Sequence, residues 1–279
     1  MMYTKRELVI ATMHRKESVI APVLERELGV RCQVVTGFDT DQLGTFSGEK
    51  ERKEDALSTA RLKCQQAMAL SGCDLAIASE GSFGPHPAIF FVPADEEILM
   101  FSDAKNNLEI VAHELSTDTN FAASSIHSEV ELDKFAEKAL FPSHGLILRK
   151  SKERYDLMTK GITDWETLHA IYRQIGEPDG VVYVETDMRA LFNPTRMRVI
   201  EKAAQKLVEK IKSCCPQCGT PGFGVTSAKE GLLCKLCHAP TQSTLSYVYT
   251  CAKCRYTKEE QFPHNKTEED PQFCDVCNP

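Results

Sequence analysis

The first 212 residues show two patterns of hydrophobic spacing. Short apolar runs predict strands, at residues 7–12, 30–35, 74–79, 98–102, 108–113, 145–149 and 180–185. Apolar residues three and four positions apart predict helices, at residues 19–28, 55–70, 129–140, 164–175 and 195–212. The runs at 98–102 and 108–113 are joined by a short polar segment and predict a hairpin. Because strands and helices alternate, we predict an α/β fold in which helices flank a mixed sheet.

The apolar run at residues 74–79 is central to this pattern, because it ends directly in the acidic Glu80. Two glycines and two prolines follow, and they predict an irregular loop that carries Ser82 and His86. Ligand sites of open α/β sheets lie at the carboxyl ends of strands. We therefore predict that Glu80 is the centre of an active site, with its carboxylate free of any salt bridge at the mouth of a phosphate-sized hollow. The alternative is a solvated acid in a tight turn.

A second candidate group lies between the first strand and the first helix. Thr12, His14 and Lys16 occupy this turn, and Arg15 adds a cation beside Lys16. Backbone N–H groups at a helix start favour anions, so the turn predicts a phosphate site. The alternative is a basic helix start that is simply solvated.

A third candidate group precedes the last helix. Asp187 follows the strand at 180–185 and is close in sequence to two cations, Arg189 and Arg196. Guanidinium groups bind phosphate through two-point contacts, which predicts an anion clamp beside a strand-end acid. The alternative is structural, with Asn193 or Thr195 capping the helix.

Cysteine spacing gives the strongest local signal. Nine of the twelve cysteines fall between residues 214 and 277, and paired cysteines in a chain that we expect to lack an export signal favour metal over disulfides. Their spacing fits two zinc ribbons of four thiolates each, the first with Cys215, Cys218, Cys234 and Cys237 and the second with Cys251, Cys254, Cys274 and Cys277. A cross-braced arrangement, in which the first pair joins the third and the second joins the fourth, uses the same residues. Four sulfurs leave no position for water in either arrangement, which predicts two structural zinc ions.

Composition and charge limit the expected cellular location of the protein and the classes of partner that it could bind. The net charge is −7, and from residue 213 onward six Lys and Arg residues stand against seven Asp and Glu residues. This balance weakens the case for nucleic acid, which stays the weaker alternative to a protein contact. The N-terminal apolar run is short and no stretch has the length of a membrane span, so we expect a cytoplasmic protein that does not contact membranes. We predict two domains, residues 1–212 for nucleotide binding or catalysis and residues 213–279 for the double zinc ribbon.

The motifs support two resemblances. Nearly the full length resembles a bacterial family of unassigned function with a C-terminal double zinc ribbon, through Ser-Glu-Gly-Ser-Phe-Gly-Pro-His-Pro (79–87), Glu-Thr-Asp-Met-Arg-Ala (185–190), Asn-Pro-Thr-Arg-Met (193–197) and the first two cysteine pairs. Residues 7–84 more distantly resemble the inosine/xanthosine triphosphatases, through Ile-Ala-Thr-Met-His-Arg-Lys-Glu, Gly-Glu-Lys-Glu-Arg-Lys-Glu-Asp and Leu-Ala-Ile-Ala-Ser-Glu-Gly.

The second resemblance implies a chemistry. That family removes pyrophosphate from non-standard purine triphosphates with a divalent cation. The resemblance therefore implies an inosine triphosphatase-like fold in which Glu80 binds Mg²⁺ or activates water, and in which Lys16 and Thr12 hold phosphates. The chain departs from the family in three places. His14 stands where the family has Asn, Glu17 takes the place of its Lys, with Lys16 one position early, and the loop after Gly81 differs.

Together these patterns predict a divalent-metal-dependent hydrolase, with Mg²⁺ or Mn²⁺, that acts on a nucleotide or a related phosphorylated small molecule. The predicted catalytic residues are Glu80, Glu49 and Asp187, and the predicted substrate contacts are Thr12, His14, Lys16, Thr45, Ser47, Ser82, His86, Arg189 and Arg196. The alternative is a non-catalytic, ligand-binding α/β domain whose zinc ribbons recruit a protein, an RNA or a second copy of the chain.

Overall fold

The computed structural model describes residues 2–35, 55–155, 157–176 and 180–279. The chain divides into two compact units, Met1–Val208 and Glu209–Pro279. The sequence predicts this domain boundary slightly later, between residues 212 and 213. Among the described helices, none has both the length and the apolar character that a membrane span requires.

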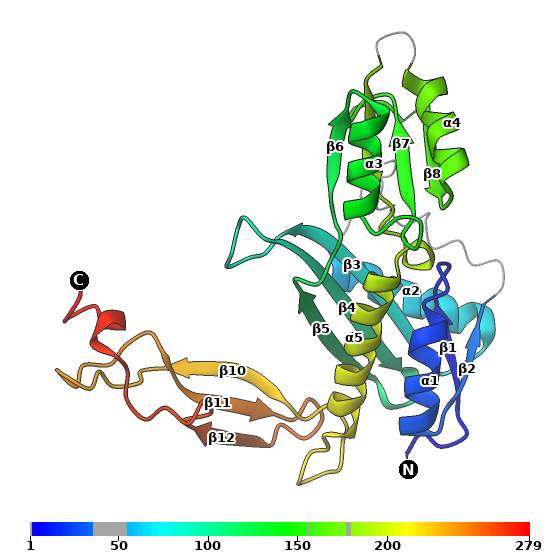
Figure 1. The fold of residues 1–279 in the computed structure, drawn as a ribbon. Helices are drawn as coiled ribbons and strands as arrows, with labels where there is room; N and C mark the ends of the chain where they lie inside the picture. The colour runs from blue at the N-terminus through cyan, green and yellow to red at the C-terminus, as the bar shows by residue number, and fades with distance from the viewer. Residues whose placement is uncertain (1, 36–54, 156, 177–179) are drawn as a thin grey trace. The chain divides into compact units, whose positions relative to one another are not determined.

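The first unit contains a five-stranded sheet with the strand order β2-β1-β3-β4-β5 (Figure 1). β1 pairs in parallel with β2 and β3, while β3, β4 and β5 pair antiparallel in sequence order. The strands are β1 (Glu7–Ala11), β2 (Arg31–Val34), β3 (Leu75–Pro85), β4 (Pro93–Asp103) and β5 (Leu108–Ser116). The predicted hairpin is therefore confirmed as β4 and β5, each longer than expected.

Helices α1 (Glu17–Leu28) and α2 (Ala56–Ser71) make the two parallel connections of this sheet. The first connection moves from β1 outward to β2, and the second returns past β1 to β3. Because both crossovers are expected to be right-handed, they place α1 and α2 on opposite faces. Val9 and Ala11 of β1 pack with Ala60 and Cys64 of α2, and alternate residues of the strands therefore turn to the other face.

β3 is longer than the sequence predicted. A strand that ends at residue 79 is wrong, because β3 pairs with β4 from Leu75, opposite Asp103, to Pro85, opposite Pro93. β1 ends opposite Ala78, so the continuing part of β3 pairs on one side only among the described strands. Glycine and proline are tolerated in such an edge segment. The predicted loop is therefore a strand that contains both Glu80 and Ser82.

The first unit also contains a second sheet, so the prediction of a single mixed sheet is wrong. Its strand order is β6-β9-β7-β8, with β6 (Ala123–Ile126), β7 (Leu146–Arg149), β8 (Met158–Ile162) and β9 (Val182–Thr186). Helices α3 (Glu129–Lys138) and α4 (Trp165–Gly176) pack on this sheet through a shared apolar core. β6 and β8 were missed because Ala-Ser-Ser-Ile and Met-Thr-Lys-Gly-Ile show little strand periodicity.

The last long helix, α5 (Pro194–Lys212), belongs mostly to the first unit. Arg196, near its start, pairs with Glu97 of β4, and Lys206 pairs with Glu114 of β5. The helix therefore lies along the antiparallel half of the five-stranded sheet.

The second unit is a three-stranded antiparallel sheet in the order β10-β11-β12. Its strands are β10 (Val225–Glu230), β11 (Thr244–Thr250) and β12 (Thr257–Gln261). One small apolar cluster, formed by Phe223 with Cys215 and Cys251, includes two of the predicted metal ligands. So small a core needs another source of stability, which metal supplies in many short domains.

Candidate functional site

Charged side chains from five elements of the first unit gather where β1 ends beside β3. The strand order makes this point the topological switch of the sheet, which is where open α/β sheets bind ligands. Each side chain of this group is at most 9% exposed, and the group, which we name the charged cluster, consists of Lys16, Lys63, Ser79, Glu80, Asp95, Glu97 and Arg196.

The first ion pair of the cluster joins α2 to β3. Lys63 Nζ lies 2.6 Å from Glu80 Oε1, and Glu80 is 3% exposed. Glu80 lies two residues after Ala78, which packs on α2, so both side chains are on the α2 face of the sheet. The expectation of a Glu80 carboxylate free of any salt bridge is therefore wrong.

The second ion pair joins β4 to α5. Arg196 Nε lies 2.6 Å from Glu97 Oε1, and Arg196 Nη1 donates to the carbonyl oxygen of Met188 over 2.5 Å. Gly81 lies opposite Glu97, and a Cβ atom at this position would be 2.4 Å from Arg196 Nη2 and 2.5 Å from Glu97 Oε1. The pair therefore depends on a residue without a side chain.

Lys16 lies between the two ion pairs. Its Nζ donates to Ser79 Oγ over 2.9 Å, and its ammonium interacts electrostatically with both Glu80 and Glu97. Burial, and then the Arg196 guanidinium, lower the pKa of Lys16 to about 8. Thr12, just before it in the chain, is also buried, and its hydroxyl has no hydrogen-bond partner among the described residues.

Asp95 is the most unusual member of the cluster. It is 1% exposed, and neither of its carboxylate oxygens has a hydrogen-bond partner within the described ranges. The same is true of Glu97 Oε2. Burial, and then the nearby Glu97, raise the pKa of Asp95 to about 8. At neutral pH Asp95 therefore holds a proton and adds no negative charge to the cluster.

Sequence analysis missed four members of this cluster, Lys63, Ser79, Asp95 and Glu97. A signal for each of the three charged residues exists in the pattern. Lys63 interrupts the apolar face of α2 that carries Ala60 and Cys64. Asp95 and Glu97 alternate along β4 just before its apolar run, which places both on one face of the strand.

The predicted anion clamp after β9, with Asp187 and Arg189, makes contacts that support the fold. Asp187 is fully buried and accepts hydrogen bonds from Arg189 Nη2 over 2.6 Å and from the Gly161 backbone N–H over 3.0 Å. The Arg189 guanidinium lies 4.6 Å from the centre of the Phe192 ring. Asn193 Oδ1 accepts from the Arg196 backbone N–H over 3.0 Å, as the capping alternative predicted. These contacts fix the approach to α5, and Arg196 connects them to the charged cluster.

The other predicted substrate contacts that the structure describes are Ser82, His86 and His14. Ser82 donates to Glu96 over 3.4 Å on an exposed part of β3. His86 Nδ1 accepts from the backbone N–H groups of Ala88 and Ile89, which orders the turn between β3 and β4. His14 is half-buried in the turn before α1. Glu49, Thr45 and Ser47 lie outside the described residues.

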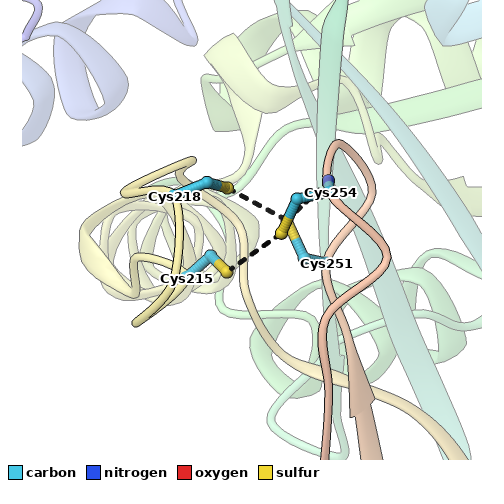
Figure 2. Close-up of side chains that lie close together, drawn as sticks. All are labelled: Cys215, Cys218, Cys251 and Cys254. Carbon is cyan, nitrogen blue, oxygen red and sulfur yellow. Dashed lines mark hydrogen bonds between the residues drawn. The ribbon is translucent and has the colours of Figure 1, made fainter.

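Eight cysteines of the second unit form two groups that could each hold a metal ion. Cys215 and Cys218 meet Cys251 and Cys254, as Figure 2 shows, and Cys234 and Cys237 meet Cys274 and Cys277. The first pair joins the third and the second joins the fourth, so the arrangement is cross-braced. The sequential grouping, with Cys215 and Cys218 beside Cys234 and Cys237, is wrong. Spacing along the chain cannot separate these alternatives, because each pair is a complete half-site in both.

The sulfur positions fit a tetrahedral ion. Within each group all four sulfurs lie within 4.8 Å of one another. Sulfurs of facing cysteine pairs approach to between 3.6 and 3.9 Å. Four thiolates at about 2.3 Å from a central zinc would be about 3.8 Å apart. Disulfide sulfurs would be about 2.05 Å apart, so the groups are not disulfides.

Each cysteine pair is a tight turn of one design. The residue after the second cysteine donates its backbone N–H to the carbonyl oxygen of the first, as Gly219 does to Cys215 over 2.8 Å. Gly219 has a φ of +69°, a conformation that glycine adopts without strain, and His238 has a φ of 58° at the equivalent position. His238 therefore belongs to the turn and not to the sulfur group. Cys214 is likewise outside both groups.

Comparisons with known proteins identify a family but no activity. A domain of unknown function, DUF6671, matches residues 63–279, in agreement with the predicted family of unassigned function. No curated protein matches the chain. A crystal structure of protein VC0702 from Vibrio cholerae is similar at 8% identity and a TM-score of 0.35, over 74% of this chain and 94% of that chain. The resemblance to inosine/xanthosine triphosphatases stays a prediction.

Proposed function

Because this chain belongs to the DUF6671 family, a domain of unknown function that matches residues 63–279, we propose its function from the charged cluster. The first unit binds a nucleotide or a related phosphorylated small molecule at the switch point between β1 and β3, and hydrolyses it with a divalent cation. The alternative, binding without turnover, is decided by the experiment below.

The proposal rests on the surroundings of the Lys16 ammonium. Its ammonium donates to the neutral hydroxyl of Ser79, and among the described residues no carboxylate lies within ion-pair distance of it. Lys63 and Arg196, in contrast, are each paired with a carboxylate. A buried ammonium without a carboxylate partner is costly unless an anion completes it. A phosphate group supplies that charge, and the position at the end of β1 is where open sheets receive it.

The carboxylates of the cluster fit a divalent cation in their donor chemistry. Glu97 offers an oxygen that accepts no hydrogen bond from the described residues, and Asp95 offers two such oxygens once ion binding displaces its proton. Within the same ranges no three acidic side chains converge as the cysteines do, which suits Mg²⁺, an ion often held by one or two carboxylates together with substrate phosphates. Bound there, the ion would neutralise charge on the phosphoryl oxygens and orient water. Lys16 would hold the phosphate from the β1 side, and Glu80 would keep Lys63 in place beside it.

We propose that both cysteine groups hold zinc in a structural role. Four thiolates complete a tetrahedral shell and leave no position for water or substrate. The hydrolytic chemistry is therefore assigned to the first unit alone.

A panel of nucleoside triphosphates with Mg²⁺ or Mn²⁺ tests the proposal, with phosphate and pyrophosphate release as the readout. We expect turnover that falls by about 100-fold or more in Lys16→Met and Glu80→Gln, the scale expected for loss of a charge that acts on the reacting group. The matched controls are Lys105→Met, at an exposed residue of the turn between β4 and β5, and Glu96→Gln, at a half-buried residue of β4.

The other outcomes separate the alternatives. Nucleotides that raise the melting temperature without any release of phosphate would establish the non-catalytic alternative. Neither turnover nor a shift in melting temperature would overturn the proposal for the first unit. Turnover that survives both Lys16→Met and Glu80→Gln would place the reaction outside the charged cluster.

A further inference from the structure

The two metal groups of the second unit share one geometry but differ in the side chains that surround them. In the second group each cysteine pair carries an apolar residue before its first cysteine and another before its second cysteine. The two segments are Leu-Cys-Lys-Leu-Cys (233–237) and Phe-Cys-Asp-Val-Cys (273–277). The equivalent segments of the first group, Cys-Cys-Pro-Gln-Cys (214–218) and Thr-Cys-Ala-Lys-Cys (250–254), have a polar residue before the second cysteine.

The four apolar side chains of the second group are exposed to solvent. Leu236 is 69% exposed, Val276 67%, Phe273 58% and Leu233 46%. The sulfurs of the two segments lie within 4.8 Å of one another, so the four side chains all lie next to ligands of one metal group. We name them the apolar tips. Clustered exposed apolar side chains on a rigid support are typical of interaction sites.

Backbone hydrogen bonds fix the segment that carries two of the apolar tips, Leu233 and Leu236. The Leu236 backbone N–H donates to Cys234 Sγ over 3.4 Å, and the Lys235 backbone N–H donates to the carbonyl oxygen of Glu269 over 3.0 Å. Because the backbone is fixed by the metal group, a partner would meet the tips at little cost in ordering.

The charges around the tips select the partner. Lys235 pairs with Asp270 and Lys266 pairs with Glu269, so both nearby cations are already neutralised. Glu268 and Asp275 are exposed acids that form no ion pair with a Lys or Arg among the described residues, and four thiolates on one Zn²⁺ leave a formal charge of about −2. The first group instead has Lys253 and Arg255 beside it. The second group is therefore both apolar and acidic.

We infer that the apolar tips form a docking surface for a protein segment in which apolar side chains are flanked by Lys or Arg. The apolar side chains of the partner cover Leu236 and Val276, and its cations meet the surrounding acids, which gives complementary charge at the rim. The acidic surroundings disfavour a nucleic-acid backbone, which would need the opposite sign of charge.

A selection from a random 12-residue peptide display library on the full-length, zinc-loaded chain tests this inference. We expect enriched peptides to combine apolar residues with Lys or Arg. Synthetic copies of these peptides should bind Leu236→Ser/Val276→Ser at least tenfold more weakly than the unaltered chain. The matched control, Gln217→Ser/Lys253→Ser, changes the same two turn positions in the first metal group and should alter binding less than twofold. Zinc content and far-UV circular dichroism verify that both double variants are folded.

The remaining outcomes overturn the inference. They are an absence of enriched peptides, enrichment of acidic peptides, or equal binding by both double variants. Sedimentation that shows self-association of the unaltered chain, lost in Leu236→Ser/Val276→Ser, would assign the tips to a second copy instead. RNA binding that depends on Leu236 and Val276 would assign them to nucleic acid.

Discussion

At the scale of single residues, Gly81 decides whether a buried ion pair can form. A Cβ atom at this position would be 2.4 Å from Arg196 Nη2 and 2.5 Å from Glu97 Oε1, and both partners are at most 1% exposed. We expect Gly81→Ala to lower the free energy of unfolding by about 1–3 kcal/mol, the usual cost of overpacking, or more if it separates the charges. Equilibrium unfolding in urea measures this change.

Gly84→Ala is the control, because it lies in the same strand and an added Cβ would meet nothing within 4 Å. Alanine there should leave stability unchanged or raise it by about 0.5–1 kcal/mol, since glycine is the less favourable residue in a strand. Equal effects of the two substitutions would show that the ion pair does not depend on the space at Gly81.

Asp95 gives stability a defined pH dependence. Burial, and then Glu97, raise its pKa from the ordinary 3.8 to about 8 in the folded chain. Between these values the folded chain holds a proton that the unfolded chain has released, so stability falls as the pH rises through this window. Asp95→Asn removes the effect, and its advantage over the unaltered chain should grow from pH 5 to pH 8 by at most about 1.4 kcal/mol per pH unit.

Thermal or urea unfolding at several pH values measures this difference. The exposed Asp118→Asn is the control and should show a difference that does not change with pH. A stability advantage of Asp95→Asn that is flat or shrinks toward pH 8 would contradict a protonated Asp95.

These residues also show where sequence reasoning about the site stops. Glu80 and Lys16 were predicted because each follows an apolar strand, which is a local signal. Lys63, which pairs with Glu80, and Arg196, the cation that acts on Lys16, lie on helices whose packing against the sheet brings them there. Arg196 was read as an anion clamp with Arg189, yet it pairs with Glu97, 99 residues away. Pairing over such a distance is a property of the fold and has no trace in local spacing.

At the scale of elements, β3 shows how composition can mislead. Gly81, Gly84 and Pro85 predicted a loop, because both residue types are rare inside strands. Each is tolerated here because β1 ends opposite Ala78, which leaves only β4 to pair with the rest of β3. The position of the strand start was predictable from its apolar run, whereas its end depended on where a neighbouring strand stops.

The cysteine turns allow a sharp test of the cross-braced arrangement. Cys215→Ala/Cys251→Ala removes two ligands from one group and should leave the other group intact, so elemental analysis should give about one zinc per chain. Cys215→Ala/Cys234→Ala damages both groups and should give little or no zinc.

The sequential ribbons predict the reverse order for these two double variants. A zinc content that is higher in Cys215→Ala/Cys234→Ala than in Cys215→Ala/Cys251→Ala would therefore contradict the cross-braced arrangement. The unaltered chain, which should contain about two zinc ions, is the reference for both.

At the scale of the whole molecule, the two units differ in what holds them together. Within the described ranges, the first unit packs apolar residues against both of its sheets, and its helices and strands were largely predictable from hydrophobic spacing. The second unit has one small cluster that includes Cys215 and Cys251, and β10 is exposed along its whole length. The sequence did not predict its strands, because their folding depends on metal ligation more than on buried apolar residues.

Removal of metal should therefore unfold one unit and spare the other. Structural zinc contributes about 10–16 kcal/mol in small metal-dependent domains, more than a small apolar cluster can replace. After treatment with a strong chelator under reducing conditions, we expect amide hydrogen exchange to become fast in β10, β11 and β12 and to stay slow in β3, β4 and β9. Within α5, protection should be lost only in its final turn, because the division between the units falls after Val208. Loss of protection in β3 and β4 would show that the first unit depends on the metal, and retained protection in β11 would show that the second unit does not.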